Sequence, residues 1–174
     1  MGESSTSSEV RPATRADGPA LRALSVATFP NNAEADLVDA LLAGDAWVDG
    51  LSQVAEADDG SLVAYAILSR CQIDGAPALA LAPCAVHPDL QRQGVGTATI
   101  AAALEAARAA GEPLVVVLGP AAYYARFGFV RASTLGIGAP LDVPDEAWMA
   151  LVLDPERAAP SGTVAYADAF GVGT

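Results

Sequence analysis

The run Gln91-Arg92-Gln93-Gly94-Val95-Gly96-Thr97 is the part of the sequence whose residue types and spacing most clearly suggest chemistry. It follows an apolar run that ends at Val86 and opens an alanine-rich stretch typical of a helix. The first turn of a helix leaves about four backbone N–H groups without intrahelical partners, and glycines let a ligand approach them closely. This order of strand, glycine turn and helix predicts an anion-binding site, with phosphate as the natural ligand.

Two familiar nucleotide-binding motifs do not fit this turn. The dinucleotide fingerprint needs a third glycine where the chain has Thr99, and an acidic residue about 20 positions further on, where a strand is predicted at Pro113–Val117. A triphosphate loop needs a Gly-Lys-Ser/Thr sequence, and the chain contains no lysine. The spacing Gln91-x-x-Gly94-x-Gly96 resembles instead the Gln/Arg-x-x-Gly-x-Gly/Ala signature of the GCN5-related N-acetyltransferases, in which this turn holds the pyrophosphate of acetyl-CoA.

Two further segments carry the same resemblance. Ala85-Val86-His87-Pro88 looks like the end of that family's fourth strand, and Tyr123-Tyr124-Ala125-Arg126-Phe127-Gly128-Phe129 looks like its last helix running into a glycine-phenylalanine pair. The predicted hairpins and tail are most similar to the subgroup of predicted N-acetyltransferases typified by the bacterial YhbS protein. The resemblance covers nearly the whole chain.

The resemblance implies acetyl-CoA as the cosubstrate and no metal. The family's fourth and fifth strands splay apart, and Pro83 marks a local distortion at the corresponding place. The residues expected to bind acetyl-CoA are Cys84, Ala85, Val86, Gln91, Arg92, Gln93, Gly94, Val95, Gly96, Thr97 and Arg126.

The implied reaction is the attack of a neutral amine on a thioester, which benefits from an oxyanion donor, an acid for the departing thiolate and a base. Tyr124 lies four residues before Gly128, where the family often has the tyrosine that serves as the acid; its alternative is a buried packing residue. Glu56 is the candidate base, with a solvent-facing carboxylate as the alternative. His87, in a turn, and Cys84, on an apolar strand, are weaker candidates.

Acceptor specificity is expected to come from the break between two predicted helices, at Phe29, Asn31 and Asn32, and from the segment Gly136–Pro144. The chain has a net charge of −12, which slightly favours a cationic amine, either a small molecule or a peptide. The same charge makes binding to nucleic acid improbable. The alternative to an enzyme is a noncatalytic acyl-CoA-binding or interaction domain. Tyr124 favours the enzyme hypothesis, because a domain that only binds has no need of a proton donor.

The strand and helix pattern predicts an α/β (α+β) fold, with a mixed central sheet and helices on both faces. Strands are expected at Val10–Thr14, Leu51–Ala57, Leu62–Arg70, Leu79–Val86, Leu114–Leu118, Phe129–Ala132 and Met149–Leu153, with a short one in the tail Ser161–Phe170. Helices are expected from Asp17 to Phe29, Ala33 to Ala43, Thr97 to Ala110 and Pro120 to Gly128.

The length of 174 residues suits one domain, here residues 9–174, after a polar tail over residues 1–8 that is expected to be disordered. Two cysteines without a secretion signal favour a reduced, cytoplasmic protein. No apolar run approaches a membrane span. The oligomeric state, including a homodimer, is left open.

Overall fold

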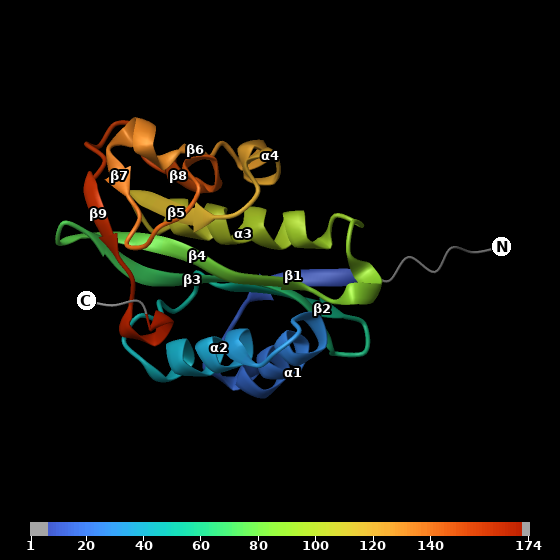
Figure 1. Ribbon diagram of the computed structural model, residues 1–174. Helices are drawn as coiled ribbons and strands as arrows, with labels where there is room; N and C mark the ends of the chain where they lie inside the picture. Colours follow the sequence, from blue (N-terminus) through green and yellow to red (C-terminus); the bar gives the residue numbers. More distant parts are fainter. Residues whose placement is uncertain (1–6, 172–174) are drawn as a thin grey trace.

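The computed structural model describes residues 7–171 as a mixed, nine-stranded sheet with helices on both faces, as the sequence predicted (Figure 1). The strands are β1 (Ser8–Pro12), β2 (Gln53–Ala57), β3 (Leu62–Ile73), β4 (Ala76–Val86), β5 (Leu114–Leu118), β6 (Val130–Arg131), β7 (Ile137–Gly138), β8 (Trp148–Val152) and β9 (Gly162–Ala165). The α-helices are α1 (Gly18–Thr28), α2 (Ala33–Ala43), α3 (Val95–Ala109) and α4 (Ala121–Tyr124). Short 3-10 helices are η1 (Arg15–Asp17), η2 (Pro88–Leu90), η3 (Ala125–Phe127), η4 (Ala132–Leu135), η5 (Asp145–Ala147) and η6 (Asp168–Phe170).

The sheet changes from antiparallel to parallel at its centre. Strands β1 to β4 are antiparallel neighbours, β4 pairs with β5 in parallel, and β5 continues through β8 to β6. The parallel pairing of β4 with β5 depends on the crossover through α3, because two parallel strands need a long connection that returns the chain to the same end of the sheet. β1 is an edge strand that ends at Pro12, which is where a proline is tolerated.

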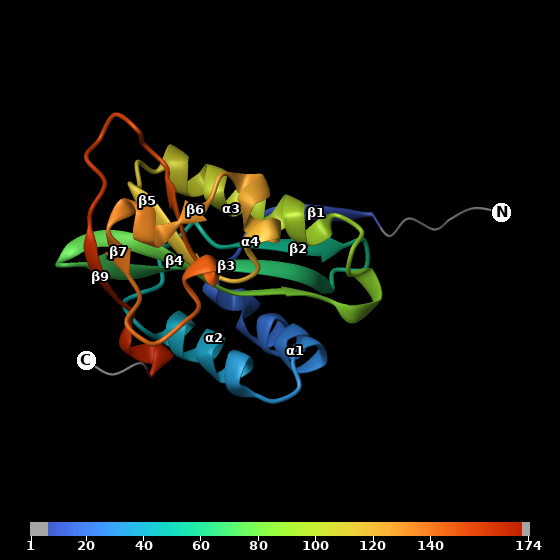
Figure 2. The ribbon, with the colours of Figure 1, turned by 45° about the horizontal axis from the view of Figure 1, so that its top comes forward.

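Helices α1 and α2 cover one face of the sheet, and α3 and α4 lie on the other (Figures 1 and 2). Leu21, Leu24, Val38 and Leu41 of the first pair are buried against the sheet, which follows from their helical spacing. The second helix begins and ends where the sequence predicted. The Asn31 side chain accepts a hydrogen bond from the N–H of Ala33 at 2.9 Å, and Gly44 follows the last turn.

Strand β4 is distorted at Pro83, as the sequence suggested. The register with β3 advances from Leu68 opposite Leu81 to Ala66 opposite Cys84, so β4 accommodates one extra residue there. On its other edge β4 pairs with β5 only at Leu79 and Ala80. Within residues 7–171, β4 has no further partner in β5, so the two strands separate toward the Val86 end.

Several predicted strand boundaries shift by two or three residues, as at β2, which begins at Gln53 where Leu51 was predicted, and at β4, which begins at Ala76 where Leu79 was predicted. Ser8, predicted to lie in the tail, begins β1 and pairs with Ala57; the rest of that prediction, residues 1–6, lies outside the described residues. The predicted tyrosine helix starts after Pro120 and ends at the left-handed Gly128 as expected, but only its first turn, α4, is α-helical, and the rest is the 3-10 helix η3. The short strand β7 was not predicted. It pairs with β9, which is the short strand that the sequence did predict in the tail.

Candidate functional site

A pocket of about 110 Å³ lies where β4, the start of α3 and α4 meet, and its lining includes Tyr124 and four of the residues predicted to bind acetyl-CoA. We call it the β4 pocket. Its lining residues come from β3, β4, α3 and α4: Tyr65, Cys84, Ala85, Val86, Gly96, Ile100, Tyr123 and Tyr124. The separation of β4 from β5 opens this side of the sheet to a ligand.

The glycine turn forms the start of α3. Gly94 has φ of 89°, a left-handed conformation that favours glycine, and its carbonyl accepts from the N–H of Ala98 at 3.0 Å. The N–H groups of residues 95–97 precede that bond and have no intrahelical acceptor. A Cβ on Gly96 would lie 2.7 Å from Cγ2 of Val86, so only glycine fits between the helix and β4.

The side chains of Gln91 and Gln93 in the turn form hydrogen bonds with backbone carbonyls of the preceding residues. Gln91 Nε2 donates to the carbonyl of Val86 at 3.2 Å, and Gln93 Nε2 donates to the carbonyl of Asp89 at 3.3 Å. Arg92 is exposed and has a positive φ of 66°. The glutamine side chains therefore hold the loop, and the anion-binding capacity lies in the backbone and in nearby arginine side chains.

Arg126 lies beside the start of α3. Its guanidinium carbon is 4.4 Å from the ring centroid of Tyr123, and its Nη1 reaches Thr97 Oγ1 at 3.5 Å. The hydroxyl of Tyr123 is 3.2 Å from the same Thr97 oxygen. These contacts hold the positive charge of Arg126 next to the free N–H groups, and they tie the Tyr123 side chain to the start of α3.

Tyr124 is buried at the inner end of the β4 pocket. Burial raises the pKa of its hydroxyl well above the ordinary value, and the neighbouring Cys84 thiol adds to the shift, so the hydroxyl keeps its proton at neutral pH. A Cβ on Gly119 would collide with the Tyr124 ring, so the absence of a side chain at Gly119 makes room for that ring. The structure thus brings Tyr124 and the glycine turn to one pocket.

The surroundings of Cys84 and His87, the two weaker catalytic candidates, do not favour a catalytic role. Desolvation raises the pKa of the Cys84 thiol to about 12, so it carries almost no thiolate at neutral pH. His87 lies in the turn after β4, where its Nδ1 accepts from the N–H of Asp89 at 3.2 Å, and it does not line the β4 pocket.

Other predicted residues lie away from the pocket. Glu56 does not line it, and its carboxylate accepts from Arg11 Nε at 2.6 Å. Asn31 and Asn32 are exposed at the start of α2, and half-buried Phe29 packs against the core beneath α1 and α2. This arrangement does not favour the base role predicted for Glu56.

Sequence reasoning missed Tyr65, which lines the β4 pocket from β3. Its hydroxyl is 2.6 Å from Ser25 Oγ of α1, and burial raises its pKa to about 12. A tyrosine inside an apolar strand carries no signal of its own. Only its register, opposite Ala85 in β4, brings it to the site.

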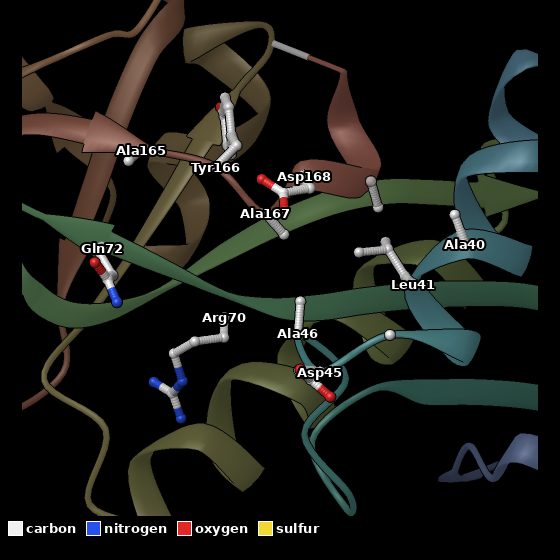
Figure 3. A pocket seen from close by; sticks show the side chains of 12 residues that line it. Ala40, Leu41, Asp45, Ala46, Arg70, Gln72, Ala165, Tyr166, Ala167 and Asp168 are labelled. Carbon is white, nitrogen blue, oxygen red and sulfur yellow. The ribbon is translucent and has the colours of Figure 1, made fainter. Parts of the chain in front are cut away.

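A larger hollow lies elsewhere in the described structure. It has a volume of about 710 Å³ and lies between the end of α2, β3 and the C-terminal segment, with Asp45, Asp168 and Tyr166 in its lining (Figure 3). Arg70, also in the lining, forms an ion pair with Glu112 at 2.6 Å. None of the residues expected to bind acetyl-CoA lines it.

Within residues 7–171 no group of three or more His, Cys, Asp or Glu side chains is arranged to hold a metal ion. In the same residues no helix combines the length and the apolar character needed to cross a membrane.

Comparisons with known proteins agree with this geometry. Residues 48–131 match the model of the acetyltransferase (GNAT) domain. The chain is 33% identical over 162 residues to the uncharacterized N-acetyltransferase YjhQ of Escherichia coli, covering 88% of this chain and 89% of YjhQ.

Two solved structures are similar as well. The fold matches the crystal structure of the GNAT family N-acetyltransferase YhbS from E. coli in complex with CoA, with a TM-score of 0.89 and 25% identity over 98% of this chain and 96% of that one. It also matches a GNAT family acetyltransferase from Brucella melitensis in complex with acetyl-CoA, with a TM-score of 0.77 and 30% identity over 95% of this chain and 99% of that one. The expected likeness to the YhbS-like group is confirmed.

Proposed function

Because the chain belongs to the GNAT family of N-acetyltransferases, we propose that it transfers the acetyl group of acetyl-CoA to a primary amine of a small molecule or peptide by direct attack on the thioester. One observation carries this proposal. The glycine turn at the start of α3 and the buried Tyr124 hydroxyl meet at the same pocket, where β4 has left β5. A site for a phosphate-bearing ligand and a proton donor are thereby adjacent.

The residues of the turn fit the phosphates of acetyl-CoA. Free N–H groups at residues 95–97, the absence of a Cβ at Gly96 and the nearby guanidinium of Arg126 together form an anion site. Arg92 adds charge at the entrance, while Gln91 and Gln93 hold the loop. Cys84, Ala85 and Val86 offer the backbone of β4 to the pantetheine arm.

The thioester supplies an activated acetyl group, and the chain's own residues assist its transfer. The unpaired edge of β4 after Ala80 can donate an N–H to the developing oxyanion. Tyr124, which remains protonated, donates to the departing thiolate. No role as a base is given to Glu56, because Arg11 occupies its carboxylate.

The acceptor is expected to approach from the α1–α2 side, past Phe29, Asn31 and Asn32. Tyr65 supports this approach, because it lines the β4 pocket and also bonds to Ser25 of α1. Both cysteines are free, in keeping with the reducing, cytoplasmic location expected from the sequence.

Two measurements test the function. Acetyl-CoA at about 100 times its Kd adds roughly 2.7 kcal/mol to the free energy of unfolding, which raises Tm by several degrees at about 2–4 °C per kcal/mol. The second measurement is the release of CoA from acetyl-CoA with a panel of primary amines. A Tm shift without CoA release above background would identify a noncatalytic acyl-CoA-binding domain instead, and no shift would refute the cofactor.

A further inference from the structure

Two hydroxyl groups on the α1 side of the sheet are linked to each other and to the backbone of α1. Ser25 Oγ donates to the carbonyl of Leu21, one turn earlier in α1, at 2.8 Å, and the Tyr65 hydroxyl lies 2.6 Å from the same Ser25 oxygen. A serine hydroxyl has one proton, and here the Leu21 carbonyl accepts it. The Tyr65 hydroxyl is therefore the donor in its bond with Ser25, and its oxygen keeps an acceptor lone pair that no donor among residues 7–171 occupies.

Tyr65 and Tyr124 line the β4 pocket from opposite faces of the sheet. Tyr65 belongs to the apolar core beneath α1 and α2, and Tyr124 belongs to the core beneath α3. Both tyrosines line the pocket, together with Cys84 and Ala85 of β4. The Tyr65 side chain is only 1% exposed, so the pocket is where a ligand can meet it. A group bound between the two tyrosines has a proton donor on its α3 side and an acceptor oxygen on its α1 side.

An acceptor oxygen suits the attacking group of the reaction. A neutral primary amine has two N–H donors and one lone pair, and only the lone pair can attack the thioester carbon. A hydroxyl that is free to donate would bind this lone pair and hold the amine in an unreactive orientation. A hydroxyl whose proton is already bound to Ser25 accepts an N–H instead, which leaves the lone pair of the amine free to attack.

We propose that Tyr65 Oη accepts a hydrogen bond from the acceptor amine and orients its lone pair toward the thioester, and that Ser25 is the positioning residue that keeps Tyr65 in this role. This inference rests on the proposed function and adds the group that binds the amine at the same site. The chain of hydrogen bonds ends at the Leu21 carbonyl, which does not take up a proton. Tyr65 therefore orients the amine and does not act as its base.

The first test measures CoA release from saturating acetyl-CoA with n-butylamine as the acceptor. Tyr65→Phe should raise KM for the amine and lower kcat/KM roughly three- to tenfold, as expected for one hydrogen bond, without changing the Kd for acetyl-CoA. Ser25→Ala frees the Tyr65 proton to turn toward the amine, so it should cause a similar loss. The double variant should be no worse than Tyr65→Phe alone, because both changes remove the same contact. Tyr166→Phe, which removes a hydroxyl from the larger hollow, is the matched control and should behave as wild type.

The second test measures amine binding without turnover, by fluorine NMR of 2,2,2-trifluoroethylamine added to the CoA complex. The fluorine atoms keep this primary amine neutral at neutral pH, and its Kd should rise in Tyr65→Phe by the same factor as in the kinetic test and stay unchanged in Tyr166→Phe. Equal kcat/KM and equal amine Kd in Tyr65→Phe and wild type would overturn the inference and leave the proposed function intact. Losses that add in the double variant would show that Ser25 does not act through Tyr65. Binding that depends on Tyr65, without CoA release for any amine, would refute the proposed function and leave the amine contact standing.

Discussion

The two sides of the sheet differ in the kinds of contact that they bring together. On the α3–α4 side, the expected acetyl-CoA site is defined by close contacts and backbone groups: Gly96 against Val86, Gly119 against the Tyr124 ring, and free N–H groups in the first turn of α3. The α1–α2 side includes a cluster of charged side chains, in which Arg11 pairs with both Asp17 and Glu56. A cosubstrate that never changes suits a rigid steric site, whereas charge is the simpler means of selecting among acceptors.

The largest effect is expected from Tyr124→Phe, which removes the proton donor and keeps the ring on Gly119. We expect kcat to fall by roughly tenfold to a thousandfold, the usual range for a general acid, while the Kd for acetyl-CoA hardly changes. Steady-state kinetics with the best amine and calorimetry with acetyl-CoA measure the two quantities.

The neighbouring tyrosine provides the matched control. Tyr123→Phe loses only the contact with Thr97 and should change kcat much less than Tyr124→Phe. Unchanged turnover in Tyr124→Phe, or a larger loss in Tyr123→Phe, would remove Tyr124 from the mechanism.

Gly96→Ala tests the steric nature of the cofactor side. The new methyl group would lie 2.7 Å from Val86 Cγ2, and relieving such an overlap typically costs about 1–3 kcal/mol. Because the strain falls on the start of α3 and the end of β4, we expect acetyl-CoA affinity to drop about tenfold, together with a lower Tm. Gly138→Ala is the control, since its Cβ would meet only ordinary contacts at 3.6 Å from Thr163 Oγ1. Equal affinity in both variants would contradict a site that depends on close packing.

The variant Glu56→Gln tests whether Glu56, on the α1–α2 side of the sheet, is the general base of the reaction. Since Arg11 holds this carboxylate away from the β4 pocket, we expect kcat to stay within about twofold of wild type and Tm to fall slightly, as for a surface ion pair worth about 0–1 kcal/mol. A pH–rate profile of both proteins is the measurement. A loss of turnover that high pH restores would reinstate Glu56 as the base.

The sequence predicted the cofactor side better than the acceptor side, and the reason is physical. The glycine turn and the α3 helix are contiguous in the chain, and Tyr124 follows after a single strand, β5, so the crossover that their order predicts brings them to the same side of the sheet. Tyr65 meets Ser25 only through the packing of α1 on the sheet, and it reaches the β4 pocket only through the register of β3 with β4. No local sequence pattern encodes the strand register or the helix packing. The sequence suggested Glu56 as a base, and it could not reveal the ion pair of Glu56 with Arg11, because that pair depends on the pairing of β1 with β2.

The smallest effect concerns the pH dependence of stability on the charged side. Arg11 binds Asp17 through two hydrogen bonds at 2.8 and 2.9 Å, and this side-chain bond is the main reason why the pKa of Asp17 lies below its usual range. A carboxylate with a lowered folded-state pKa stabilises the fold above its unfolded pKa, about 3.9, and loses that contribution as pH falls through the folded value. Asp17→Asn should therefore lower Tm by about 1–4 °C at neutral pH, as for a partly exposed pair, and the difference from wild type should vanish in acid. Thermal unfolding of both proteins from neutral to acidic pH measures it. A difference that persisted at the lowest pH would assign the effect to the hydrogen bond that the Asp17 side chain accepts from the Thr14 N–H at 2.8 Å, and not to the charge of the pair.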